Sequence, residues 1–200
     1  DASHLSVPAD PPRLRRPAPA VEGIAAAATL LNGSKTPLIL AGGGAVQSAE
    51  RLQALAETLD APVVMTTNAR GSLPPDHPLG VSLTASMQQT RALVAAADVV
   101  LALGTELGPT DYDFYEDGGF AIPGKLIRVD IDPAQIMRSH MPSLGLVGDV
   151  GEAVAQLTPL IAQRLSGSGS DRARIANGGS ADLPRPMRAG LQILDLYRKT

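Results

Sequence analysis

The stretch Pro37-Leu38-Ile39-Leu40-Ala41-Gly42-Gly43-Gly44-Ala45 decides the fold of this chain. It reads as a short apolar strand that ends in three consecutive glycines, and a helical pattern follows it. Four more apolar runs repeat this order of strand, loop and helix, at 62–66, 99–103, 126–131 and 144–147. None of the five runs alternates polar with apolar residues. We therefore expect each strand to be buried on both faces, as in a parallel sheet.

Helical patterns between these runs supply the crossovers that parallel strands require. They cover 21–31, 48–59, 86–96 and 150–165, and a short helix begins at Asp132-Pro133, with Asp as N-cap and Pro in the first turn. The sequence predicts a doubly wound α/β domain, a mostly parallel sheet with helices on both faces (Rossmann-like). Ligands of such folds bind beyond the carboxyl ends of the strands, where the glycines lie.

Composition divides the chain into four parts. Residues 1–20 form a Pro-rich N-terminal linker with Arg13, Arg15 and Arg16, which we expect to be extended. Its arginines either solvate it or recognise a phosphate or acidic partner. The central α/β domain covers 21–166, a Gly/Ser-rich flexible exit linker 167–190, and the start of a following domain 191–200. The sequence is interpreted as a piece of a longer polypeptide.

Charge and composition exclude several classes of function. The net charge of −3 gives no electrostatic reason to bind nucleic acid or an anionic membrane. The absence of cysteine excludes disulfides, thiolate metal sites and a cysteine nucleophile. No apolar run approaches the ~18–20 residues that span a bilayer. We predict a cytoplasmic protein that contacts neither nucleic acid nor membrane.

The glycine run leaves several interpretations open. Gly42-Gly43-Gly44-Ala45-Val46-Gln47 supplies the first two glycines of a G-x-G-x-x-G motif, but Gln47 stands at the third. The next strand ends in Met65-Thr66 and lacks the acid that binds an NAD ribose. These departures argue against an ordinary NAD site. The glycines remain either an anion seat made of backbone amides or a tight turn that packs against the sheet.

Other motifs are less specific. The loop 104–124 holds several carboxylates and four of the five aromatic residues, Tyr112, Phe114, Tyr115 and Phe120. It is either a ligand wall or interface, or a solvated loop with an aromatic anchor. His77-Pro78 is expected to close a turn, because no histidine has metal-ligand spacing. Gly33-Ser34-Lys35-Thr36 precedes its strand and is rejected as a phosphate loop. We predict no catalytic and no metal-binding residue.

Six motifs occur in an order that resembles a known family: 38–44, 61–64, 71–78, 97–104, 126–133 and Gly148-Asp149. Over 21–165 the chain resembles the central domain of thiamine-diphosphate-dependent enzymes of the acetolactate synthase and 2-oxo-acid decarboxylase group. The resemblance implies a parent homodimer or homotetramer that holds thiamine diphosphate and Mg²⁺ between flanking pyrimidine- and diphosphate-binding domains. The Gly-Asp-Gly…Asn motif of the family does not occur in this chain. The resemblance thus implies a non-catalytic central domain of a lyase or transferase.

At this domain the resemblance implies FAD, ADP or no ligand, and the candidate contacts are eight residues: Gly42, Gly43, Thr66, Gly104, Thr105, Asp130, Ile131 and Asp149. Asp130 would accept from ribose hydroxyls and Asp149 from the adenine amino group. The sequence departs from the FAD-binding pattern, since Glu106 stands where the synthases carry an arginine. The loop 110–113 resembles decarboxylases of amino-acid-derived oxo acids, guanidino ones among them. The alternative is a free-standing nucleotide- or NAD-binding module that uses the same crevice.

Overall fold

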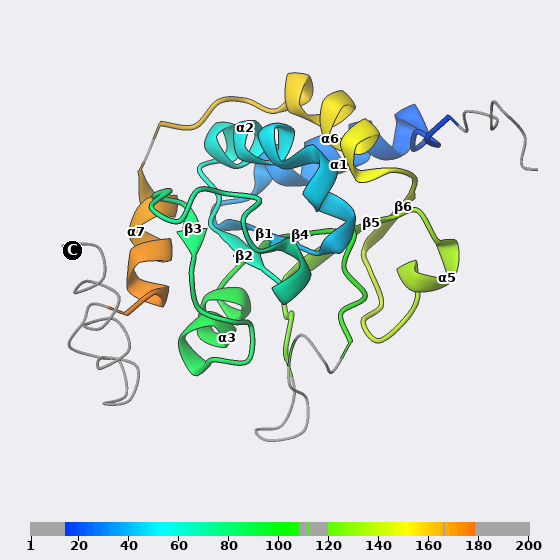
Figure 1. Cartoon of the computed structure of the whole chain (residues 1–200). Coiled ribbons are helices and arrows are strands. Elements are labelled where there is room, and N and C mark those ends of the chain that lie inside the picture. Colours follow the sequence, from blue (N-terminus) through cyan, green and yellow to red (C-terminus); the bar gives the residue numbers. More distant parts are fainter. Residues whose placement is uncertain (1–14, 109–111, 113–119, 166, 179–200) are drawn as a thin grey trace, which may run out of the picture.

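A computed structural model describes residues 15–108, 112, 120–165 and 167–178. Its sheet has six parallel strands in the order β3-β2-β1-β4-β5-β6 (Figure 1). The chain starts at β1 in the middle, runs outward to β3, and then crosses to β4 and runs outward to β6. This confirms the predicted doubly wound fold. The strands are β1 (Pro37–Ala41), β2 (Val63–Met65), β3 (Gly80–Val81), β4 (Val99–Leu103), β5 (Lys125–Asp130) and β6 (Leu144–Val147).

Helices cover both faces of the sheet. One face packs against α1 (Val21–Gly33), α2 (Ala49–Leu59) and α6 (Val150–Leu157), and the other against α3 (Gln88–Ala95) and α7 (Ser168–Ala176). The short α5 (Pro133–Ile136) connects β5 to β6. Three 3₁₀ segments complete the described secondary structure: η1 (Gly43–Ser48), η2 (Thr67–Ala69) and η3 (Thr158–Leu160).

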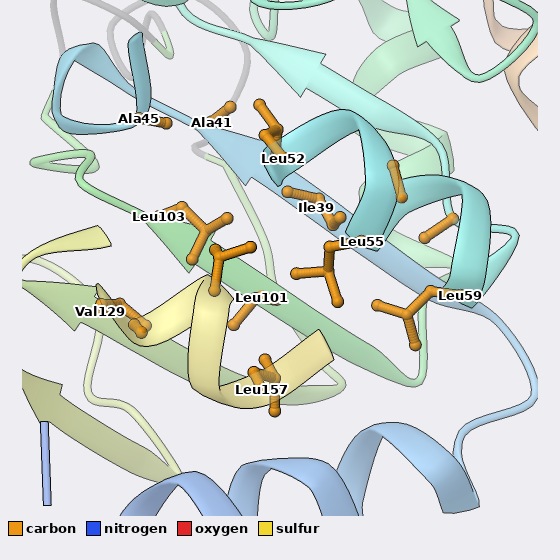
Figure 2. Packing of buried hydrophobic residues seen from close by; sticks show 14 of the residues in the cluster. Ile39, Ala41, Ala45, Leu52, Leu55, Leu59, Leu101, Leu103, Val129 and Leu157 are labelled. Carbon is orange, nitrogen blue, oxygen red and sulfur yellow. The ribbon is translucent and has the colours of Figure 1, made fainter. Parts of the chain in front are cut away.

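The central strands are buried on both sides, as their unbroken apolar runs predict. Ile39 and Ala41 of β1 contribute to the core under α1, α2 and α6, whereas Leu38 and Leu40 contribute to the core on the α3 side. Figure 2 shows the first of these cores, with α2 leucines directed toward β1 and β4. Side chains that alternate between two apolar layers explain why the sequence shows no polar alternation.

Two predicted boundaries were wrong on the C-terminal half of the molecule. The helix expected at 150–165 ends at Leu157, because Pro159 cannot donate the next helical hydrogen bond, and the chain tightens into η3. The exit linker was predicted to be flexible from residue 167, yet Ser168–Ala176 form α7. The remaining linker residues from 179 and the segment 191–200 lie outside the described residues.

The helix α7 is held in place by contacts that could not be predicted from its polar sequence. Gly169 lies so close to Asp60 that an added Cβ would meet the Asp60 carbonyl at 1.9 Å. The Arg172 guanidinium donates to the carbonyls of Pro37 (2.9 Å) and Asp60 (3.3 Å). Asn177 donates to the carbonyl of Gly80 at 2.9 Å. These contacts connect α7 to the amino end of β1 and to the edge strand β3, which was itself missed because it has only two residues.

The sequence Gly33-Ser34-Lys35-Thr36 does bind an anion, but that anion belongs to the chain. The Asp98 carboxylate accepts from the Ser34 hydroxyl, from the Lys35 amide (2.6 Å) and from the Thr36 amide (3.0 Å). Partial burial raises the pKa of Asp98, but the hydrogen bonds from Ser34 and the two amides outweigh it and lower the pKa to about 2. The loop therefore joins the amino ends of β1 and β4, consistent with its rejection as a phosphate site.

His77 closes a turn, as predicted. Its amide donates to the Pro74 carbonyl (3.1 Å) and its own carbonyl accepts from the Gly80 amide (2.9 Å). The imidazole Nδ1 accepts from the Leu79 amide, which leaves Nε2 to donate to Glu57 at 3.1 Å. Hydrogen bonds from Gln53 and then His77 lower the pKa of Glu57. Both ring nitrogens are thus used to fix the turn before β3.

Candidate functional site

The carboxyl ends of five strands surround a crevice of about 570 Å³. Because the strands are parallel and in register, their last residues reach the same edge, and Ala41 lies beside both Met65 and Leu103. The crevice is lined by residues that follow β1, β2, β4, β5 and β6 in turn. All eight residues predicted from the resemblance line it: Gly42, Gly43, Thr66, Gly104, Thr105, Asp130, Ile131 and Asp149. Their role in binding a cofactor stays a prediction.

Glycines lie at the point where the chain reverses its direction across the sheet, between β1 and β4. A Cβ on Gly42 would lie 2.2 Å from the Gly104 carbonyl oxygen, and one on Gly44 would lie 2.9 Å from the Gly104 Cα. Gly104 itself has φ +56°, which L-residues rarely adopt. The two loops therefore pack backbone against backbone. Close packing between loops accounts for these glycines without any ligand.

Three carboxylates lie along the half of the crevice formed by β5, α5 and α6. Asp130 accepts from the Asp132 amide at 3.0 Å, and Asp132 caps α5 by accepting from the Ala134 amide at 2.9 Å. Asp149 caps α6 by accepting from the Glu152 amide at 3.2 Å. Glu106, exposed after β4, brings a fourth carboxylate to the lining. Among the described residues that line the crevice, none is Lys or Arg.

The N-terminal arm reaches the β6 end of this crevice. The Arg16 guanidinium donates to the Asp149 carboxylate at 2.9 Å and also to the Gln47 side chain. The Asp149 amide donates to the Pro17 carbonyl at 2.8 Å. Of the two interpretations of the arm's arginines, recognition of an acidic group applies to Arg16, and that group belongs to its own chain. Residues 1–14 lie outside the described part of the structure.

A buried arginine, Arg128, donates hydrogen bonds to the loop that follows β4 and lines the crevice, and it was not predicted as a functional residue. Arg128 of β5 is 1% exposed and donates to the carbonyls of Thr105 (3.1 Å), Glu106 (3.4 Å) and His140 (3.4 Å). Burial lowers the pKa of Arg128, and the charge of Asp130 opposes this change. A lone arginine in the middle of the apolar run 126–131 was the available signal. Its hydrogen bonds fix the loop that carries Glu106.

The loop after β4 is anchored by apolar groups and one hydroxyl pair. Leu107 is fully buried and adopts a left-handed backbone with φ 53°. The Thr105 hydroxyl lies 3.0 Å from the Tyr112 hydroxyl, and the rings of Tyr112 and Phe120 are 4.6 Å apart. Tyr112 and Phe120 thus act as an aromatic anchor, one of the two interpretations above. Residues 109–111 and 113–119, which include Phe114 and Tyr115, lie outside the described residues.

Two other hollows occur in the described part of the structure. One of about 600 Å³ lies between η1 and α6, where Arg16, Arg51, Asp149 and Glu152 face one another. The other, of about 490 Å³, lies between the His77 turn and α7. Within the described ranges, no group of three or more acidic or histidine side chains could hold a metal ion. No helix in these ranges has both the length and the apolar character needed to span a membrane.

With the fold and crevice described, comparison with known proteins gives the family. Residues 24–157 match the family model described as "Thiamine pyrophosphate enzyme, central domain". The match covers more than half of the chain, so this chain belongs to that family, as the resemblance predicted.

Individual relatives agree with this assignment. The chain is 36% identical over 165 residues to a probable 2-ketoarginine decarboxylase (AruI) of Pseudomonas aeruginosa, covering 81% of this chain and 29% of that protein. It is 32% identical over 156 residues to the large subunit of acetolactate synthase isozyme 1 of Escherichia coli, covering 77% and 27%. The crystal structure of benzoylformate decarboxylase from Polynucleobacter necessarius superposes with a TM-score of 0.66 at 25% identity, covering 80% of this chain and 31% of that one.

The chain spans less than a third of the length of the curated relatives that it matches. It is a central domain of the acetolactate synthase-like and decarboxylase type of thiamine pyrophosphate enzyme. The comparisons give no support to the alternative of a free-standing nucleotide- or NAD-binding module.

Proposed function

We propose that this chain is the non-catalytic central domain of a thiamine-diphosphate-dependent enzyme that acts on 2-oxo acids. The observation that carries the proposal is the family match over 24–157, combined with coverage of less than a third of each curated relative. The parent would bind thiamine diphosphate with Mg²⁺ between its pyrimidine- and diphosphate-binding domains, as a cytoplasmic homodimer or homotetramer. In this assignment the described side chains of the central domain position the flanking domains and take no part in chemistry.

The direct test compares this chain with the full polypeptide that contains it. Thiamine diphosphate with Mg²⁺ should leave the thermal unfolding of the 200-residue chain unchanged. The same ligand should stabilise the full polypeptide, by ~2.7 kcal/mol when its concentration is about 100 times Kd. Stabilisation of the isolated chain would contradict a non-catalytic role. A full polypeptide that shows no response to thiamine diphosphate would overturn the assignment of the parent.

Between the two classes of relative, we propose that the parent is a decarboxylase of an amino-acid-derived 2-oxo acid, such as 2-ketoarginine. Identity to the P. aeruginosa decarboxylase is 36% over 165 residues, compared with 32% over 156 for the E. coli synthase. Glu106 also stands where FAD-binding synthases are expected to carry an arginine. The assay measures CO₂ release from 2-ketoarginine against acetolactate formation from pyruvate. Faster acetolactate formation would contradict this choice and leave the family assignment intact.

A further inference from the structure

The family resemblance implies FAD or ADP in the strand-end crevice, and the residues present there can be compared with what a phosphate group requires. A diphosphate bound at the first loop of such a sheet needs free backbone amides, the start of an α-helix and a positive or neutral surrounding. The crevice differs from this requirement in three independent respects. These differences are properties of this chain and do not depend on the activity of the parent.

Three of the four backbone amides of the 42–45 loop already donate within the chain. The Gly42 amide donates to the Leu103 carbonyl (2.9 Å), the Gly44 amide to the Gly104 carbonyl (3.1 Å) and the Ala45 amide to the Gly42 carbonyl (3.0 Å). The segment that follows is the 3₁₀ segment η1, and the α-helix α2 begins only at Ala49. Neither free amides in a row nor the first turn of an α-helix therefore faces the crevice at the glycines.

The charge of the crevice also opposes a phosphate. Its lining includes the carboxylates of Glu106, Asp130, Asp132 and Asp149, and the described lining residues include no Lys or Arg. The sequence 104–124, which connects β4 to β5, contains no basic residue that could add one. A diphosphate placed there would meet the like charges of Glu106, Asp130 and Asp132, with no Lys or Arg among the described lining residues to offset them.

The third difference concerns Asp149, which the resemblance assigns as the acceptor for the adenine amino group. One oxygen of the Asp149 carboxylate accepts from the Glu152 amide, and the other accepts from Arg16 at 2.9 Å. Pro19 packs against Gly148, the residue before Asp149, so closely that an added Cβ there would lie 2.6 Å from the proline Cδ. The guanidinium of Arg16 thus takes the place of the amino donor that a nucleotide would offer to Asp149.

From these three observations we infer that the crevice excludes FAD and ADP, and that Arg16 of the N-terminal arm, which lines the adjoining hollow, occupies the Asp149 carboxylate at the β6 end. Arg16 is an internal ligand of Asp149 and Gln47. The closed contact between the Gly42–Gly44 loop and Gly104 replaces the diphosphate seat. The hollow is then a feature of the fold, and its polar groups form hydrogen bonds within the chain itself.

The first experiment measures binding of FAD and of ADP to the 200-residue chain by calorimetry, after a cooperative unfolding transition has shown that the chain is folded. We expect no saturable heat up to about 1 mM of either nucleotide, and no rise in Tm, whereas a ligand with a Kd of about 10 µM would raise the Tm measurably at that concentration. Saturable binding of either nucleotide with a Kd below about 100 µM would overturn the inference.

The second experiment tests the role of the arm by hydrogen exchange of the Asp149 amide, which donates to the Pro17 carbonyl. Arg16→Ala should speed this exchange at least about tenfold by releasing the arm, with the core amides of β1 and β4 unchanged. Arg15→Ala is the matched control, because Arg15 is a neighbouring exposed arginine of the same arm. Equal exchange rates in the two variants would show that Arg16 does not hold the arm against Asp149.

Discussion

The two edges of the sheet carry similar loops with glycines and carboxylates but use them differently. At the amino edge, Asp98 binds the amides of the 34–36 loop, and Arg172 binds the carbonyls of Pro37 and Asp60. At the carboxyl edge, a hollow of about 570 Å³ remains among the loops. Hydrogen bonds at the amino edge therefore connect the strands to the loops and to α7. The carboxyl edge, in contrast, retains a hollow where ligands of such folds bind.

The comparison also shows that an open shape need not mean free binding groups. Three glycine-loop amides and both oxygens of Asp149 form hydrogen bonds within the chain. Polar groups form hydrogen bonds within the chain at both edges. What distinguishes the carboxyl edge is its hollow. Substitutions at either edge should therefore lower the free energy of unfolding by removing contacts within the chain. The expected losses are given below from the largest to the smallest.

The largest effect is expected at the contact between the β1 and β4 loops. Gly42→Ala would place a Cβ 2.2 Å from the Gly104 carbonyl oxygen, and backbone atoms on both sides leave no flexible group to move aside. We expect a loss of about 4 kcal/mol in the free energy of unfolding, measured by urea denaturation.

Gly33→Ala is the matched control for this collision, since nothing lies within 4 Å of a Cβ at that position. It should change the free energy of unfolding by less than about 1 kcal/mol, with stabilisation as the favoured sign because Gly33, the last residue of α1, does not have a positive φ. Equal losses in the two variants would mean that the loops can separate, and that the carboxyl edge is less closed than described.

The next effect belongs to the amino edge. Arg172→Met keeps the length of the side chain but leaves the carbonyls of Pro37 and Asp60 without its guanidinium donor, so α7 should loosen. We expect a loss of about 2–3 kcal/mol in the free energy of unfolding.

Arg174→Met on the same helix is the control, because its ion pair with Asp171 is exposed on both sides. It should cost less than about 0.5 kcal/mol. Hydrogen exchange of α7 gives the local readout. If α7 exchanges at the same rate in the Arg172 and Arg174 variants, the helix is held by its apolar contacts alone.

A smaller, pH-dependent effect is expected at Asp98. Its pKa is lowered from its usual value to about 2, so its contribution to stability is present at neutral pH and is lost as the pH falls from about 4 through 2. Because Asp98 is only partly buried, solvent screens its charge, and we expect Asp98→Asn to cost about 1 kcal/mol at pH 7. Urea unfolding at pH 7 and near pH 2.5 measures the difference, which should shrink at the lower pH.

Asp171→Asn provides the comparison for Asp98, since it removes an exposed carboxylate that accepts from a single side chain. Its effect should stay within about 0.5 kcal/mol at both pH values. A constant cost of Asp98→Asn from neutral to acid pH would show that the loss comes from packing at the amino edge and not from the charge.

The difference between the edges also explains what could be read from the sequence. The apolar runs predict the strands because burial on both faces leaves a local signal, and parallel order places Gly42, Gly104 and Asp130 at one edge. The members of the crevice were therefore predictable. Their occupation by partners within the chain was not, because Arg16 and Asp149 are 133 residues apart and nothing local in the sequence relates them.

The same reasoning applies to the elements that were missed. Strand β3 has two residues, too few to show a period, and it forms because it pairs with β2. Helix α7 has a polar, Gly- and Ser-containing sequence, and it is held by Asp60 and by packing on α3. Tertiary contacts override a weak local propensity in both cases. Arg128 was visible in the sequence, but its four carbonyl partners come from two distant loops.

The smallest effect concerns the hydroxyl pair that fixes the loop after β4. Thr105 and Tyr112 are both buried and their hydroxyl oxygens are 3.0 Å apart, so each hydroxyl partly satisfies the other. Thr105→Val and Tyr112→Phe should each cost about 1 kcal/mol, and the double variant should cost less than their sum by about 0.5–1 kcal/mol. Unfolding free energies of the three variants complete the cycle. Simple additivity would mean that the two hydroxyls do not interact, and that Arg128 and the apolar contacts of the loop order this wall of the crevice.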